Sequence, residues 1–355
     1  MVNKKNDWSE RTELKELAVR VISFMLSLIL GFVAVVRVSA ANTEEISEEE
    51  SQRREKAIER MISGFENMEE KIDISDLGIL PEELKGVFSA ATKNSPYLFF
   101  VGNDLRYTFR KGGCVVSVMP QYLYSEAEVK AMTEFCKTEI SKLSSLARHG
   151  KSELERVIFL HDLICERFSY DLTLKNNNLC SFLKAGKGTC QGYTWTYMAA
   201  LRELGIECEY VASDTIVHIW LRLKIDDEWY NSDVTWDDPP QNEGTGKKSR
   251  AHFLFSDAEA EIDGYVNRYS SSDVKCLDKK YDGEDFLLEY PFCTTTGDVD
   301  HDGKAGLKDL LLLRMYIDKG IENKSLCLAC ADADRNCVID ERDLNDIRKN
   351  ILLSG

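Results

Sequence analysis

The sequence predicts an α+β domain followed by a small all-α module. Three observations support this fold class: a cysteine that opens a helical segment, two alternating apolar segments typical of paired strands, and an acidic loop that occurs twice near the C-terminus. At 355 residues the chain is long enough for more than one domain. Its net charge of −16 and lack of a basic patch argue against nucleic acid and anionic membrane surfaces as partners.

Residues 1–40 have the pattern of a secretory signal. Basic residues precede an apolar run over residues 21–36, and small residues follow it up to Ala40. Because this run is shorter than the ~20 apolar residues of a typical spanning helix, we predict cleavage after Ala40, with an uncleaved anchor as the alternative. We therefore expect a secreted, extracellular protein that has no membrane partner once the signal is removed.

Residues 41–90 form a charged, helix-prone N-terminal segment. Apolar residues such as Met61 and Phe65 recur at spacings of three and four, which predicts one apolar stripe on a solvated helix. The expected organisation is this segment, a central domain over residues 91–290, and a C-terminal module over residues 293–355.

Cys190 stands at the start of a predicted helix near the middle of the chain. It follows a glycine-containing turn, and larger apolar residues then recur at helical spacing until Gly205. The unpaired N–H groups and the dipole at a helix N-terminus favour a thiolate, which is what a nucleophile needs. The side chain of Gln191, or the backbone N–H of Cys190, can help form an oxyanion hole. The alternative role for Cys190 is that of a small buried hydrophobic residue.

Two predicted strands supply the partners of such a nucleophile. Residues 216–225 alternate between two faces, and a second strand follows at 229–234. If residues 226–227 form a two-residue hairpin turn, His218 and Asp233 lie on the same side of the sheet, whereas a three-residue turn would break this parity. The chain then supplies a nucleophile, an imidazole base and a carboxylate that orients the ring.

These segments resemble the transglutaminase-like or papain-like cysteine domains of bacterial secreted proteins. The resemblance rests on GTCQGYTWTYMAALRELGIEC around Cys190, VHIWLRLKIDDEWYNSDVTWDDP around His218 and Asp233, an upstream FSYD and a downstream HFLFSD. It covers about residues 90–260. It is specific for the fold and the three residues and much less specific for the reaction, because such domains include cross-linkers, peptidases, deamidases and members without known activity.

The resemblance implies a core in which the helix bearing the cysteine packs on an antiparallel sheet bearing the histidine and the aspartate. Cys190 would form a thioester with a protein or peptide substrate, His218 would act as base and acid, and Asp233 would orient the ring. Tyr170 would stabilise the oxyanion or line the acyl site, with a plain core tyrosine as the alternative. No cofactor is expected in this domain.

Two other functions stay open. A non-catalytic module would keep the fold and use an aromatic cleft to hold a peptide or glycan, and four tryptophans surround the predicted triad strands: Trp195, Trp220, Trp229 and Trp236. A plain aromatic core is the other interpretation of these tryptophans. A carbohydrate-active enzyme is the third function, although no paired carboxylates stand in a recognisable frame. The complete triad favours the enzyme.

Near the C-terminus an acidic loop occurs twice, and an apolar helical segment follows each copy. The copies begin at Asp298 and Asp332, an offset of 332 − 298 = 34 residues. Oxygen ligands at loop positions 1, 3, 5 and 12, with a backbone carbonyl at position 7, are what calcium requires. We predict two Ca²⁺ ions, held by Asp298, Asp300, Asp302, Lys304 and Asp309 in loop 1 and by Asp332, Asp334, Asn336, Val338, Asp340 and Asp343 in loop 2.

Residues from about 295 to 355 resemble a dockerin, the paired calcium-loop module that binds an extracellular enzyme to a cohesin domain of a scaffold protein. The resemblance implies a cell-surface multi-enzyme complex of the cellulosome type, linked to the degradation of plant polysaccharides. Two departures stand out: Cys337 replaces the usual glycine at position 6 of loop 2, and Gly306 offers no side chain at position 9 of loop 1. Both predict weaker or slower calcium loading.

The chain has 11 cysteines, an odd number that leaves at least one unpaired. Most stand in apolar patterns, which indicates buried thiols. Cys327, Cys330 and Cys337 lack a fourth ligand at the usual zinc spacing, so a disulfide within this group is the preferred interpretation.

Overall fold

A computed structural model describes residues 48–354 apart from 111–112, 151, 239, 241–248, 271, 273, 284–295, 301 and 321–325. The predicted signal over residues 1–40 lies outside this range, so its cleavage stays a prediction. Residues Glu49–Gly355 form one compact unit. Within the described part of the chain, no helix has the length and apolar character needed to cross a membrane.

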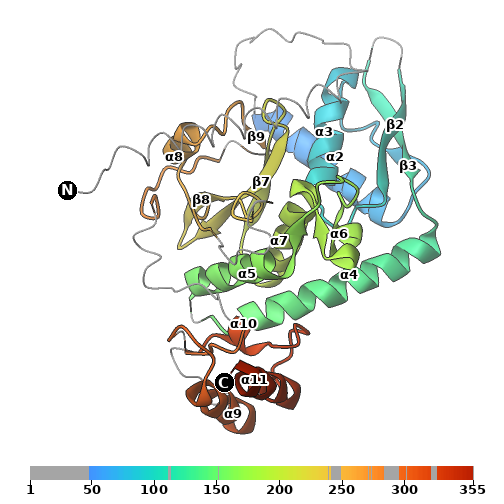
Figure 1. Ribbon diagram of the computed structural model, residues 1–355. Coiled ribbons are helices and arrows are strands. Elements are labelled where there is room, and N and C mark those ends of the chain that lie inside the picture. Colours follow the sequence, from blue (N-terminus) through green and yellow to red (C-terminus); the bar gives the residue numbers. More distant parts are fainter. Residues whose placement is uncertain are drawn as a thin grey trace. The chain divides into compact units, whose positions relative to one another are not determined.

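The N-terminal segment is part of the main hydrophobic core. It forms α2 (Glu48–Glu66), β1 (Ile72–Asp73) and α3 (Pro81–Lys93). The predicted apolar stripe of α2 is buried at Met61 and Phe65. Strand β1 pairs with β3 (Val115–Tyr122). Strand β3 also pairs with β2 (Val101–Phe109), which lies beside it in Figure 1, so the antiparallel sheet has the order β1-β3-β2.

Four helices, one of which begins at the predicted nucleophile, follow in the chain. They are α4 (Glu126–Ala147), α5 (Glu153–Arg167), α6 (Leu179–Ala185) and α7 (Cys190–Glu203), with the short parallel pair β4 (Ser169–Tyr170) and β5 (Lys187–Gly188) between them. Ser125 and Ser152 cap α4 and α5 by accepting backbone N–H groups of the first turn. Helix α7 is central: it packs on α4, α5 and α6 and also on the sheet that follows in sequence.

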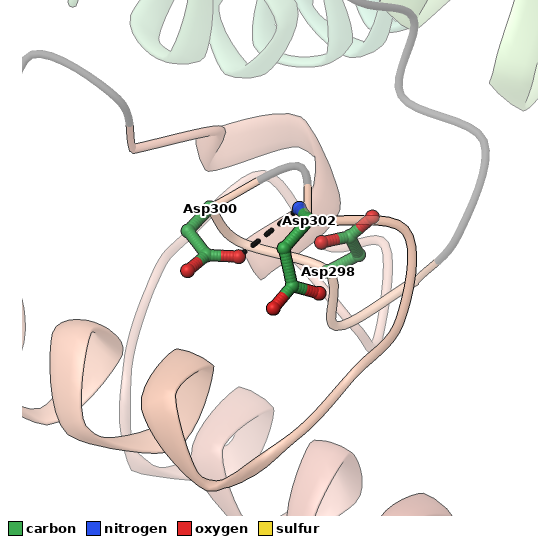
Figure 2. Close-up of side chains that lie close together, drawn as sticks. All are labelled: Asp298, Asp300 and Asp302. Atoms are coloured by element: carbon green, nitrogen blue, oxygen red, sulfur yellow. Dashed lines mark hydrogen bonds between the residues drawn. The ribbon is translucent and has the colours of Figure 1, made fainter.

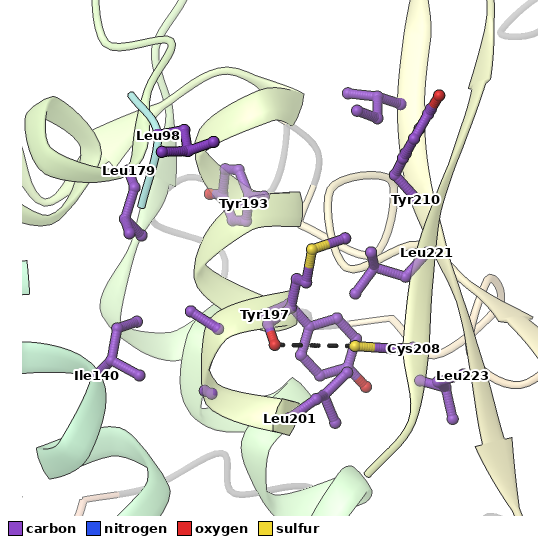
Figure 3. Close-up of a cluster of buried hydrophobic side chains, with 14 of the residues drawn as sticks. Leu98, Ile140, Leu179, Tyr193, Tyr197, Leu201, Cys208, Tyr210, Leu221 and Leu223 are labelled. Atoms are coloured by element: carbon purple, nitrogen blue, oxygen red, sulfur yellow. Dashed lines mark hydrogen bonds between the residues drawn. The ribbon is translucent and has the colours of Figure 1, made fainter. Parts of the chain in front are cut away.

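That second sheet has the strand order β8-β7-β6-β9. Its strands are β6 (Cys208–Ser213), β7 (His218–Ile225), β8 (Glu228–Ser232) and β9 (Tyr269–Ser270), and α8 (Asp257–Ile262) lies between the last two in sequence. Figure 3 shows Tyr197 and Leu201 of α7 between Ile140 of α4 and Leu223 of β7. The core therefore continues from the helices through α7 to the sheet, in agreement with the predicted α+β class.

The hairpin of β7 and β8 has the register that the sequence predicts. Ile225 pairs with Glu228, and residues 226–227 form a two-residue turn. Both turn residues have positive φ angles, 51° and 69°, as a type I′ turn requires. Because side chains on the same face recur every second residue, this register places His218 diagonally opposite Asp233.

The C-terminal residues form α9 (Leu307–Lys319), α10 (Leu328–Ala331) and α11 (Glu341–Ser354). They have a small core of their own around Val299, Leu313, Ala331 and Ile347. One cysteine prediction is wrong here: Cys330 is disulfide-bonded, but Cys327 and Cys337 both carry thiols, so the bond does not form within this group.

Candidate active site

Cys190 is the first residue of α7, as the sequence predicts. Its N-cap, Thr189, makes no side-chain hydrogen bond to the helix, so the first-turn N–H groups are not capped from there. These N–H groups can stabilise a thiolate or a developing oxyanion. Cys190 is partly exposed, whereas of the other thiols in the described residues only Cys114 is not buried. Cys190 is therefore not a fully buried hydrophobic residue, the alternative role that the sequence allows.

Two glycines let α7 begin this close to its neighbours. A Cβ atom on Gly188 would lie 2.2 Å from the carbonyl oxygen of Asn176, and one on Gly192 would lie 2.4 Å from Cδ2 of Phe182. Both distances are far below normal contact. The G-T-C-Q-G motif is thus explained by packing, because the glycines on either side of Cys190 leave room for α6 and the preceding loop.

His218 and Asp233 meet across the end of the hairpin. The Nε2 atom of His218 lies 2.6 Å from Oδ2 of Asp233, and both side chains are buried. The Cys190 side chain lies close enough to the His218 ring to contribute to raising its pKa. The structure therefore brings the three predicted residues close together.

The electrostatics of this site favour an imidazolium. Burial opposes protonation of His218, but the charge and hydrogen bond of Asp233, together with the nearby Cys190 side chain, outweigh it and raise the pKa of His218 to about 10. The expected resting state of His218 is therefore an imidazolium held by a buried carboxylate.

The Asp233 carboxylate is held on both of its oxygens. Oδ1 accepts hydrogen bonds from the backbone N–H groups of Thr235 at 3.0 Å and Trp236 at 3.3 Å, an arrangement typical of an Asx turn. Oδ2 accepts from His218 and also from the hydroxyl of Tyr265 at 2.9 Å. The orienting residue thus has four donors, and the Tyr265 hydroxyl comes from a distant residue that the sequence analysis did not single out.

Two indoles flank the His218 ring. Trp236 lies 5.0 Å from it with an interplanar angle of 15°, and Trp220 lies 5.8 Å from it at 17°. Trp220 is buried and donates its Nε1–H to Asn231, so it belongs to the core. Trp236 is only partly buried and forms a wall of the site. The predicted aromatic surroundings are thus divided between core packing and the site.

A second charged cluster lies behind the triad and was missed from the sequence. Asp237 accepts from the buried ring of His161 at 3.1 Å and from the partly exposed ring of His252 at 3.3 Å. Asp162 binds the other nitrogen of His161 and pairs with Arg250. Asp237 closes the turn that begins at Asp233, with its N–H donating to the Asp233 carbonyl. The only sequence signal was its place in the TWDD run, four residues after Asp233.

The two oxyanion candidates lie near the sulfur but differ in kind. Gln191 follows Cys190 in the first turn of α7 and is partly exposed. Tyr170, in β4, is held beside Cys190 because β4 pairs with β5 directly before the cysteine. Burial, and to a smaller extent the charge of Cys190, raises the pKa of Tyr170 to about 12, so its phenol stays a hydrogen-bond donor at neutral pH.

Comparison with known proteins places the three predicted residues within one family match. Residues 141–234 match the family model described as the transglutaminase-like superfamily, and the match contains Cys190, His218 and Asp233. This chain carries a transglutaminase-like domain. A solved structure titled "Crystal structure of a TGase" is similar to 44% of the chain with 16% sequence identity and a TM-score of 0.27; the similar region spans 49% of that protein. No curated protein matches the sequence.

Outside the transglutaminase-like domain, acidic side chains gather in both predicted calcium loops. The carboxylates of Asp298, Asp300 and Asp302 converge within 4.8 Å of one another, as Figure 2 shows. In the second loop Asp332, Asp334 and Asp343 do the same. The buried Oδ1 of Asp298 makes no hydrogen bond, which fits an oxygen that would bind a cation.

Not every predicted calcium ligand joins these clusters. Both oxygens of Asp309 accept backbone N–H groups of its own loop, from Val299, Asp300 and Gly306. The carboxylate of Asp340 is bound by Arg342, and Asp332 of loop 2 is contacted by the guanidinium of Arg167. The donor set fits Ca²⁺, but in this structure other groups hold several of its oxygens.

Proposed function

We propose that the transglutaminase-like domain is a cysteine-nucleophile acyl-transfer enzyme acting on a carboxamide or peptide carbonyl of a protein substrate. The observation that supports it is the buried Asp233–His218 pair close to Cys190, which stands at the N-terminus of α7. A buried carboxylate that orients an imidazole beside a sulfur is the arrangement that nucleophilic catalysis needs.

In the proposed reaction the Cys190 thiolate attacks the carbonyl carbon, and the negative charge moves to the carbonyl oxygen. First-turn N–H groups of α7, with Gln191 or Tyr170, stabilise that oxygen. The imidazolium of His218 then donates its proton to the departing amine or ammonia, which leaves a thioester. Water or a second amine attacks the thioester, His218 accepts the proton of that nucleophile, and the Cys190 thiolate is released.

The reaction class can be measured directly. We expect that a peptide library incubated with the protein and a primary amine will show one of three mass changes: cleavage, a one-dalton increase from deamidation, or incorporation of the amine. The Cys190→Ala variant should show none of them, because no thioester can form. Equal product with wild type and variant, or no product with either, would contradict the enzyme and favour a non-catalytic binding module.

We further propose that residues 293–355 are a dockerin-like module that binds two Ca²⁺ ions. The acidic clusters described above support this part of the proposal. Loaded with calcium, the module would bind a cohesin domain of a scaffold protein and attach the secreted enzyme to a cell-surface complex that degrades plant polysaccharides. The signal pattern of residues 1–40 supports secretion. The resemblance of the C-terminal sequence to a dockerin supports cohesin binding and the link to polysaccharide degradation.

We expect Gly303→Ala to weaken calcium binding at loop 1 by about tenfold. Gly303 has a φ angle of 98°, and nothing lies within 4 Å of the Cβ that a substitution would add, so the only cost is left-handed strain of about 1–2 kcal/mol. Isothermal titration with CaCl₂ measures the effect. Gly264→Ala is the matched control, since its φ angle is 88° with equally open surroundings outside the loops. Equal calcium affinity in both variants would contradict the site.

A further inference from the structure

Tyr265 makes a contact with Asp233 that no sequence pattern predicted. It lies 32 residues after Asp233, beyond α8, and only 1% of its surface is exposed. Its hydroxyl donates to Oδ2 of Asp233 at 2.9 Å, the same oxygen that His218 approaches at 2.6 Å. One carboxylate oxygen therefore accepts hydrogen bonds from both the proposed base and a buried phenol.

The ring of Tyr265 also supports the walls around His218. It lies 4.5 Å from Trp236 and 4.8 Å from Trp220, the two indoles that flank the imidazole. Burial, with the charge of Asp233 as a second cause, raises the pKa of Tyr265 well above its usual range. The hydroxyl therefore keeps its proton and stays a donor at any pH at which the protein would work.

The two oxygens of Asp233 are held in different ways. Oδ1 is fixed by backbone N–H groups of its own turn, whereas the donors to Oδ2 are the side chains of His218 and Tyr265. Rotation about the Cβ–Cγ bond moves both oxygens together, so the donors to Oδ1 and the donors to Oδ2 fix the orientation of the carboxylate jointly. During acyl transfer His218 gains and loses a proton on its other ring nitrogen, so the charge of this donor changes, whereas Tyr265 is a side-chain donor to Oδ2 whose charge stays constant through the cycle.

We propose that Tyr265 is a positioning residue for the Cys190–His218 pair, which acts by holding Oδ2 of Asp233 toward the imidazole and by supporting the indoles on either side of it. This inference rests on the proposed function, because it concerns the same Cys190–His218 pair. It differs from an ordinary core role, in which the hydroxyl would only satisfy its own hydrogen bond.

Alkylation of Cys190 by iodoacetamide, followed by peptide mass spectrometry from pH 4 to 9, tests the proposal. We expect Tyr265→Phe to slow alkylation at pH 6 by about tenfold, as the loss of one hydrogen bond to a charged group would. The rise of the alkylation rate on the acid side of the pH profile should move to higher pH. The reason is that a less well positioned Asp233 carboxylate stabilises the His218 imidazolium less. Cys114, the other thiol that is not buried, is the internal reference.

Tyr230→Phe is the matched control. Tyr230 is a buried tyrosine of β8 whose hydroxyl donates to Oδ2 of Asp278 at 2.6 Å, so its loss removes the same kind of bond in the same domain. Its alkylation profile should match wild type. In an Asp233→Asn background, Tyr265→Phe should have no further effect, because the residue acts through Asp233.

The outcomes separate the two proposals. If Cys190 of the wild type reacts no faster at pH 6 than Cys114, the proposed function fails and Tyr265 has nothing to position. If the wild type reacts faster but Tyr265→Phe keeps its profile, or shifts it no more than Tyr230→Phe, the inference on Tyr265 is overturned. If Tyr265→Phe does not fold, the downfield proton NMR spectrum of the wild type is the deciding measurement. We expect it to contain resonances of His218 Nε2–H and of a tyrosine hydroxyl, both of which should vanish in Asp233→Asn. Absence of the hydroxyl resonance from the wild-type spectrum overturns the inference.

Discussion

Asp233→Asn is expected to lower the rate of acyl transfer by about a hundredfold to ten-thousandfold, the range that general acid–base catalysis supplies. The carboxylate both orients the His218 ring and stabilises its positive charge. The side-chain amide of asparagine is nearly equal in size to the carboxylate but carries no charge. It can present an N–H to Nε2 of His218, and this favours the tautomer in which Nε2 accepts instead of donating. Initial rates of the reaction found with the peptide library, at saturating substrate, measure the effect.

The same variant should change the pH dependence in a defined direction. His218 has a pKa of about 10 in the folded protein, above the value of about 6.5 for a free histidine. Its pairing therefore stabilises the fold fully below pH ~6.5 and loses this contribution as the pH rises through about 10. Without the Asp233 charge the imidazolium is lost at lower pH, so the stability difference between wild type and variant should shrink between pH 7 and 10.

Asp278→Asn provides the control for this pair of measurements. Asp278 also accepts a tyrosine hydroxyl but lies apart from the triad residues in the hydrogen-bond network. We expect its acyl-transfer rate to stay within about twofold of wild type after correction for folded protein, as for a surface change away from the site. A loss as large as that of Asp233→Asn would mean that general destabilisation, and not the lost carboxylate, explains the effect.

The parts of the site that sequence could predict are those fixed by local rules. A turn before Cys190 and apolar residues at helical spacing were enough to place the sulfur at a helix N-terminus. Strand alternation and a two-residue turn were enough to place His218 and Asp233 on one face. In both cases the positions of the side chains depend on a few residues that are neighbours in sequence. The local sequence pattern is therefore sufficient to predict them.

The parts that sequence missed depend on contacts between distant segments. Tyr265 reaches Asp233 only because α8 and the loops around it fold back over β8, and no periodicity in the sequence signals that approach. His161 lies between Asp162 and Asp237, and its contact with Asp237 joins residues 76 positions apart. Likewise, the charged N-terminal segment contributes β1 to a sheet, since pairing with β3 depends on the hairpin that follows it.

Gly192→Ala is expected to destabilise the domain by about 3 kcal/mol and to lower its melting temperature by about 6–12 °C. The added methyl carbon would lie 2.4 Å from Cδ2 and 2.6 Å from Cγ of Phe182. Phe182 is fully buried and stacks on Phe168 at 4.5 Å, so it has no room to move aside. The strain falls on the first turn of α7, and we also expect Cys190 to lose its contact with His218.

Gly86→Ala is the matched control, because it makes the same change inside a helix. Gly86 is an exposed residue of α3, and nothing lies within 4 Å of the added Cβ. Alanine there should stabilise the protein by about 0.5–1 kcal/mol, since glycine is the poorer helix former. Calorimetry gives the melting temperatures, and alkylation at pH 6 shows whether Cys190 remains reactive. A Gly192→Ala protein as stable and as reactive as wild type would show that α7 does not need a glycine to place its sulfur, and the packing explanation of the G-T-C-Q-G motif would fail.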